Sequence, residues 1–136
     1  PDLPPGRYAV ELQLPRGGGA VGPDRAVVDF CLGADLINIA REAMLSIGCI
    51  QAQKCHTDRC PSGVTTHNPY LQHGLDVGVQ SQRFARYCQS FRNELLAVTH
   101  ACGYEHPSRF TADDVEVSTG PGIFKTLRDV HGYTPA

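Results

Sequence analysis

Apolar positions recur at helical spacing in three stretches of the chain. Over residues 23–32 they lie three and four positions apart, which predicts a short helix that Gly33 ends. Residues 41–48 predict a second helix. The longest stripe predicts an amphipathic helix over residues 81–102, with Gly103 as its stop. This stripe consists of Phe84, Tyr87, Cys88, Phe91, Leu95, Val98 and Cys102.

Two stretches predict strands instead of helices. Residues 35–40 are a short, mostly apolar run after a glycine stop, which is typical of a buried strand. Residues 8–14 alternate in part, as a half-buried strand does. A strand that runs directly into a helix at Ala40 and Arg41 indicates an α/β fold. The start of a helix after a parallel strand offers free backbone N–H groups to an anion, although an isolated arginine there is more often a surface residue.

The end of the chain predicts a helical tail. Thr111 to Asp114 reads as a helix start, with a hydroxyl cap and an acidic first turn. We therefore expect three segments: an N-terminal segment of residues 1–22, a central part of residues 23–103, and a C-terminal helical tail of residues 104–136.

Composition indicates a globular protein with a modest core. The chain has 136 residues, of which 41% are hydrophobic and 19% are charged. A net charge of -2 favours neither nucleic acid nor an anionic membrane surface as a partner. The apolar runs are too short to span a bilayer. Because the chain begins with Pro1 and not with methionine, we expect a processed chain or a fragment.

The cysteines separate into a cluster and three isolated residues. The isolated ones lie inside helical patterns, whereas a secreted disulfide scaffold would spread its cysteines through loops, so we expect a reducing, cytoplasmic location. Cys49, Cys55 and Cys60 have the spacing C-x5-C-x4-C, followed directly by Pro61. Thiolates are the usual ligands of iron in sulfide clusters, and three on one short loop suit the three irons of a [3Fe–4S] cluster.

Spacing alone leaves other interpretations of the cysteine cluster open. Zinc could take the three cysteines together with His56 or His67, although structural zinc sites usually pair cysteines more closely. A disulfide would leave one thiol unpaired and needs an oxidising compartment. A nucleophilic cysteine would need an activating base. Spacing favours the iron–sulfur interpretation over each of these.

The run GADLINIAREAMLSIGCIQAQKCHTDRCPSGVTTHNP resembles the FMN-binding domain of glutamate synthases, above all its stand-alone bacterial and archaeal relatives. The resemblance covers residues 24–133. It implies the C-terminal portion of a TIM (β/α)8 barrel, followed by an iron–sulfur loop and a helical tail, with residues 36–39 as the last barrel strand. A full barrel needs about 200 residues or more, so the resemblance implies an incomplete barrel that is inactive alone.

The resemblance also implies cofactors and a reaction. Ala40 and Arg41 match the part of the family motif that borders the FMN phosphate, and Cys49, Cys55 and Cys60 match the ligands of a [3Fe–4S] cluster. The family reaction is the reductive amination of 2-oxoglutarate to L-glutamate, with glutamine or ammonia as the nitrogen source. Electrons come from ferredoxin or from an NADPH-oxidising subunit.

A second hypothesis assigns no catalysis to the chain. A small interaction module stabilised by a metal or a cluster would also account for the cysteines. Such a module would fold alone and cooperatively once metal is added, whereas a barrel fragment would expose unpaired strand edges.

Overall fold

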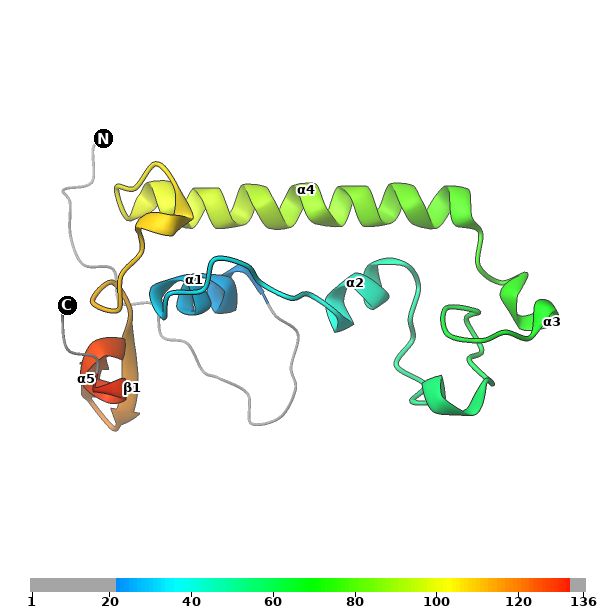
Figure 1. Ribbon diagram of the computed structural model, residues 1–136, viewed down its shortest axis with the longest axis horizontal. Helices are drawn as coiled ribbons and strands as arrows, with labels where there is room; N and C mark the ends of the chain where they lie inside the picture. The colour runs from blue at the N-terminus through cyan, green and yellow to red at the C-terminus, as the bar shows by residue number, and fades with distance from the viewer. Residues whose placement is uncertain (1–21, 133–136) are drawn as a thin grey trace. The chain divides into compact units, whose positions relative to one another are not determined.

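The structure is a computed structural model that describes residues 22–132, so the strand predicted at residues 8–14 lies outside the described part (Figure 1). The described residues fall into two compact units, one of residues 22–37 and 92–132 and the other of residues 38–91. In chain order the elements are α1 (Pro23–Cys31), α2 (Arg41–Ser46), η1 (Cys55–Thr57), α3 (Pro69–Gln72), α4 (Val77–Ala101), η2 (Pro107–Arg109), β1 (Glu116–Gly120), β2 (Ile123–Thr126) and α5 (Leu127–His131).

Helix α1 confirms the first predicted helix. Pro23 occupies its first position and Asp24 lies in its first turn, where proline and negative charge are both favourable. Gly33 follows the helix with a φ of +92°, and the next amide donates back to the carbonyl of Asp29 at 3.0 Å. This is a Schellman end, which needs a residue that adopts positive φ without strain. Val27, Val28 and Cys31 of the apolar stripe are buried.

The predicted strand at residues 35–40 is wrong for this structure. These residues form no strand, and the side chain of Leu36 is 91% exposed. A parallel strand is stable only when neighbouring strands pair with it and helices cover it. Within residues 22–132 the only sheet is the antiparallel pair β1–β2, which does not include this segment. The described residues are therefore mostly helical with one hairpin, and they form no barrel.

The predicted helix after Thr111 is also wrong. Both the amide and the hydroxyl of Thr111 donate to the Asp114 carboxylate, at 2.6 and 2.9 Å, and close a turn. The chain then enters the hairpin, in which Glu116 pairs with Thr126. Buried Val115 and Leu127 flank the two strands. After Thr111 the helical part of the tail is thus α5, because cross-strand pairing uses the backbone groups that a longer helix would need.

Helix α4 begins four residues earlier than predicted and ends one residue before the predicted end. Asp76 accepts a hydrogen bond from the amide of Val79 at 3.0 Å and so caps the start of the helix. Gly103, with a φ of +83°, follows its end. The apolar stripe predicts that Cys88 is buried, but Cys88 is exposed. The buried residues of α4 are Leu95 and Thr99, nearer the end of the helix. Among the described residues, no helix is long and apolar enough to cross a membrane.

Candidate metal centre

Helix α2 leads directly into the cysteine segment, which lies within the second unit. Gly48 has a φ of +99°, and the amide of Cys49 donates to the carbonyl of Met44 at 3.0 Å. This Schellman end fixes the direction in which the chain leaves the helix. The sulfur of Cys49 then accepts a hydrogen bond from the amide of Gln51 at 3.4 Å. A glycine at position 48 is therefore favourable, because this helix end needs a residue with positive φ.

The second and third cysteines differ in their surroundings. Cys55 is the first residue of η1 and is exposed. Cys60 is only 7% exposed, and its sulfur lies 3.4 Å from the hydroxyl of Ser62. The Ser62 hydroxyl is the largest cause that lowers the pKa of Cys60, to about 6. These surroundings favour the thiolate, which is the form that binds metals.

The backbone between the outer cysteines is strained. Gln51, Gln53 and Asp58 have φ values of 56°, 55° and 58°, and these are the non-glycine residues with positive φ among residues 22–132. Such a conformation costs on the order of 1–2 kcal/mol for each ordinary L-residue. Strain of this kind persists only where the surrounding structure imposes it, and it gathers at sites that hold ligands.

A glycine packs the end of the cysteine segment closely against α3. Gly63 has a φ of +77°, and a Cβ at this position would lie 2.6 Å from the carbonyl oxygen of Leu71. No side chain fits there unless the backbone moves. The glycine three residues after Cys60 is therefore required by a close approach of two backbone segments.

The donor chemistry of the cysteine segment fits an iron–sulfur cluster. All six cysteines are free thiols in the structure, which does not favour the disulfide alternative. Within residues 22–132, no three His, Cys, Asp or Glu side chains are gathered so as to hold a single metal ion. Thiolates are the usual ligands of iron in sulfide clusters, and in such a cluster each thiolate binds a different iron.

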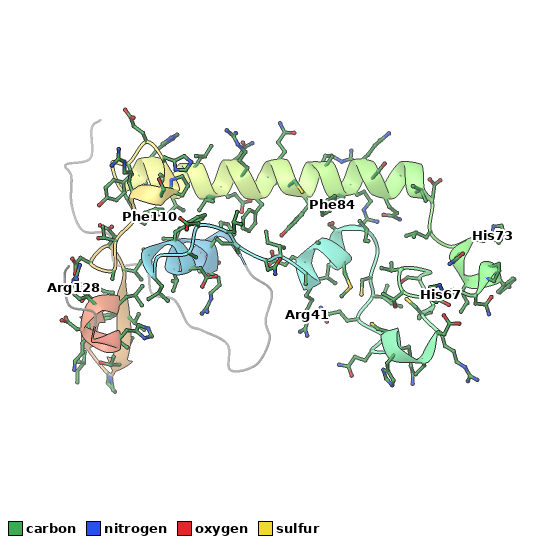
Figure 2. The ribbon with its side chains drawn as sticks, in the orientation of Figure 1. Arg41, His67, His73, Phe84, Phe110 and Arg128 are labelled. Carbon is green, nitrogen blue, oxygen red and sulfur yellow. The ribbon has the colours of Figure 1, made fainter. Side chains whose placement is uncertain are left out.

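Ala40 and Arg41 lie at the start of α2, in the same unit as the cysteines. Figure 2 labels Arg41 on this helix. Ala40 is the N-cap residue and Arg41, which is exposed, is the first residue of the helix. The predicted helix start is thus confirmed, whereas the strand expected before it is absent. Contact of these residues with an FMN phosphate stays a prediction.

A hydrogen bond that no sequence pattern predicts attaches α2 to α4. The hydroxyl of Tyr87 donates to the carboxylate of Glu42 at 2.7 Å. Burial, followed by this carboxylate, raises the pKa of Tyr87. The tyrosine ring also lies between Phe84 and Phe91, with centroid distances of 6.3 and 6.1 Å. Only the place of Tyr87 on the apolar stripe could have indicated its position, and nothing in the sequence indicated its partner.

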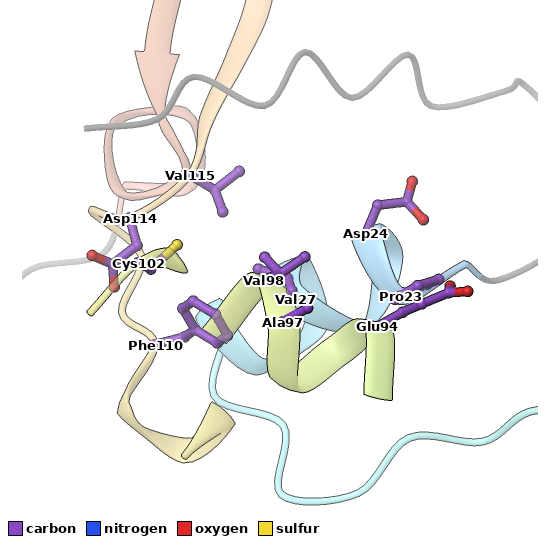
Figure 3. A pocket seen from close by; sticks show the side chains of 10 residues that line it. All are labelled: Pro23, Asp24, Val27, Glu94, Ala97, Val98, Cys102, Phe110, Asp114 and Val115. Atoms are coloured by element: carbon purple, nitrogen blue, oxygen red, sulfur yellow. The ribbon is translucent and has the colours of Figure 1, made fainter. Parts of the chain in front are cut away.

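The first unit contains a cavity of about 400 Å³ (Figure 3). Its walls come from α1, the last turns of α4 and the loop before β1. They are formed by Pro23, Asp24, Val27, Glu94, Ala97, Val98, Cys102, Phe110, Asp114 and Val115. None of the residues with a predicted chemical role lies in this cavity, so the candidate chemistry is confined to the second unit.

Comparison with known proteins shows a family match over most of the chain. The family model described as the conserved region in glutamate synthase matches residues 7–105, which include the whole cysteine segment. The match therefore also takes in part of the N-terminal segment, which lies outside the resemblance over residues 24–133. No solved structure matches the chain.

Several curated proteins are similar to the chain over most of its length. The glutamate synthase large subunit-like protein YerD of Bacillus subtilis is 40% identical over 105 residues, which are 77% of this chain and 20% of that protein. The archaeal glutamate synthase [NADPH] of Archaeoglobus fulgidus is 33% identical over 66% of the chain and 17% of its own length. The ferredoxin-dependent glutamate synthase of Pyropia yezoensis is 39% identical over 65% of the chain and 6% of its own length.

The chain thus spans a fifth or less of these relatives. The family model nevertheless covers well over half of the chain, and the matched part carries the three clustered cysteines. This chain belongs to the glutamate synthase family.

Proposed function

We propose that this chain is the iron–sulfur part of a glutamate synthase-like oxidoreductase. In this proposal Cys49, Cys55 and Cys60 bind a [3Fe–4S] cluster, and Ala40 and Arg41 border the phosphate of FMN. The observation that carries it is the set of three free thiols within one strained segment, inside the part of the chain that matches the family. When bound, the cluster would carry single electrons and the flavin would transfer a hydride.

The residues of the chain prepare the site in distinct ways. The amide of Gln51 donates to the sulfur of Cys49, and the hydroxyl of Ser62 stabilises the thiolate of Cys60. Hydrogen bonds to ligand sulfurs are one of the means by which a protein sets the potential of a cluster. At the start of α2, free amides and Arg41 would orient an anionic phosphate.

The proposed reaction is the reductive amination of 2-oxoglutarate to L-glutamate, with glutamine or ammonia as the nitrogen source. We assign it to a protein of the relatives' length and not to residues 1–136 alone, because the chain spans a fifth or less of those relatives. The names of the relatives include both NADPH and ferredoxin. The proposed electron donor is accordingly ferredoxin or an NADPH-oxidising subunit.

The cluster can be tested by anaerobic reconstitution of the 136-residue chain with ferrous iron and sulfide. We expect broad visible absorption and the EPR signal of an oxidised three-iron cluster. Cys49→Ser, Cys55→Ser and Cys60→Ser should each abolish most of both signals, because each removes the only protein ligand of one iron. The matched control is Cys88→Ser, which removes an exposed thiol outside the segment and should leave both signals unchanged.

Two results of this experiment would refute the proposal. One is a colourless protein that retains stoichiometric zinc after purification and reconstitution. The other is a set of signals that responds to Cys88→Ser as strongly as to the substitutions in the cysteine segment.

A further inference from the structure

The turn between the second and third cysteines is tied to a segment that follows them. The hydroxyl of Thr66 donates to the backbone carbonyl of Asp58 at 2.6 Å and lies 3.1 Å from its carboxylate. The amide of His67 donates to the same carboxylate oxygen at 2.5 Å. Thr66 is only 6% exposed. We call this set of contacts the Asp58–Thr66 latch.

Asp58 has a backbone conformation that few residues adopt. It directly follows η1 and has a φ of 58°, in the left-handed region. Aspartate and asparagine tolerate this region better than other residues with a side chain. Asp58 lies in sequence between Cys55 and Cys60, so its backbone angle affects the direction in which the chain runs from one cysteine to the other. The latch holds the residue that has this angle.

The segment on the other side of the latch is itself held firmly. The carbonyl of Thr66 accepts from the side-chain amide of Gln72 at 2.7 Å, and its hydroxyl accepts from the amide of Asn68 at 3.1 Å. Asn68 in turn caps α3, because its side chain accepts from the amide of Tyr70 at 2.9 Å. The latch therefore connects the cysteine turn to a capped helix and not to a free loop.

We infer that Asp58 is a positioning residue for the cluster: through Thr66 and the amide of His67 it fixes the turn that presents Cys55 and Cys60. This inference rests on the proposed function. Asp58 acts on the two ligands through the backbone between them and is itself no ligand. Residues that orient metal ligands in this way typically change metal affinity by about 10–100-fold when they are lost.

Substitutions at the latch separate hydrogen bonding from charge. Asp58→Asn keeps an oxygen acceptor and tolerates positive φ, whereas Asp58→Ala loses the acceptor. Thr66→Val removes the donor hydroxyl and keeps the size of the side chain. Arg59→Ala is the control, because Arg59 is exposed and adjacent but takes no part in the latch.

The measurements are iron and sulfide per chain, the EPR line shape, and the rate at which a chelator removes iron from the reconstituted chain. We expect Asp58→Ala and Thr66→Val to lose iron about tenfold faster than the wild type and to show an altered line shape. Asp58→Asn should restore both properties to within twofold, and Arg59→Ala should leave both unchanged.

Amide hydrogen exchange in the chain without iron gives a second readout, which does not depend on cluster assembly. Exchange of the His67 amide should become about tenfold faster in Asp58→Ala and stay unchanged in Asp58→Asn, because only the alanine lacks the acceptor. Unchanged iron loss and line shape in Asp58→Ala would overturn the inference, as would an asparagine variant that behaves like alanine. A wild-type chain that assembles no cluster would instead refute the proposed function.

Discussion

Cysteines of identical chemistry are made different by their surroundings in this chain. Cys31 is 5% exposed, and burial, followed by the Asp114 carboxylate, raises its pKa to about 12. Cys60 is held by hydroxyl groups that lower its pKa to about 6. Cys88 is exposed on α4. The residue type alone therefore does not determine the surroundings or the pKa of a thiol.

The raised pKa of Cys31 predicts that the folded state loses stability in alkaline solution. The thiol ionises near its ordinary pKa of 9.0 in the unfolded chain and at about 12 in the folded one. Its contribution is therefore fully present below pH 9 and is lost as the pH rises from 9 towards 12. Urea unfolding of the wild type and of Cys31→Ala should show a stability difference that shrinks over this range. A difference that stays constant with pH would contradict the assignment.

Sequence spacing identified the three clustered cysteines and the helix start at Arg41, because both follow from short local patterns. It did not identify Asp58, Thr66 or the pair Glu42–Tyr87. Their partners lie 8 and 45 positions away along the chain and repeat with no period. A side-chain hydrogen bond between distant segments leaves no local pattern in the sequence, so only the folded structure can find it.

At the scale of elements, a helix or strand is predictable from the sequence when the signals that stabilise it lie within the element itself. Helices α1, α2 and α4 were predicted, because an apolar period and a glycine stop act within a few residues. The strand at residues 35–40 and the helix after Thr111 were not correct. A strand needs partners elsewhere in the chain, and the pairing of β1 with β2 overrode the helix-start signal.

The glycines at positive φ give a test of how the elements are held together. Gly63 and Gly103 both have positive φ, but only Gly63 also lies against another backbone segment, at the Leu71 carbonyl. Gly103→Ala should cost about 1 kcal/mol, from backbone strain alone. Gly63→Ala adds a backbone clash and should cost clearly more. Urea unfolding measures both, and equal costs would contradict the close approach at Gly63.

At the scale of the whole molecule, the candidate chemistry belongs to the second unit. The cysteine segment, the start of α2 and the Asp58–Thr66 latch all lie within residues 38–91. The first unit contributes the hairpin and the buried stripe of α1, with no residue to which we assign chemistry. The family match covers parts of both units.

The central claim is that three thiolates of this chain bind one iron–sulfur cluster. Native mass spectrometry of the anaerobically reconstituted chain tests it most directly, because the added mass counts the iron and sulfide atoms. We expect an increment of three irons and four sulfides in the wild type and its absence in a variant with Cys49, Cys55 and Cys60 all changed to serine. A wild-type chain that carries one zinc ion, or a triple variant that still carries the cluster, would contradict the account.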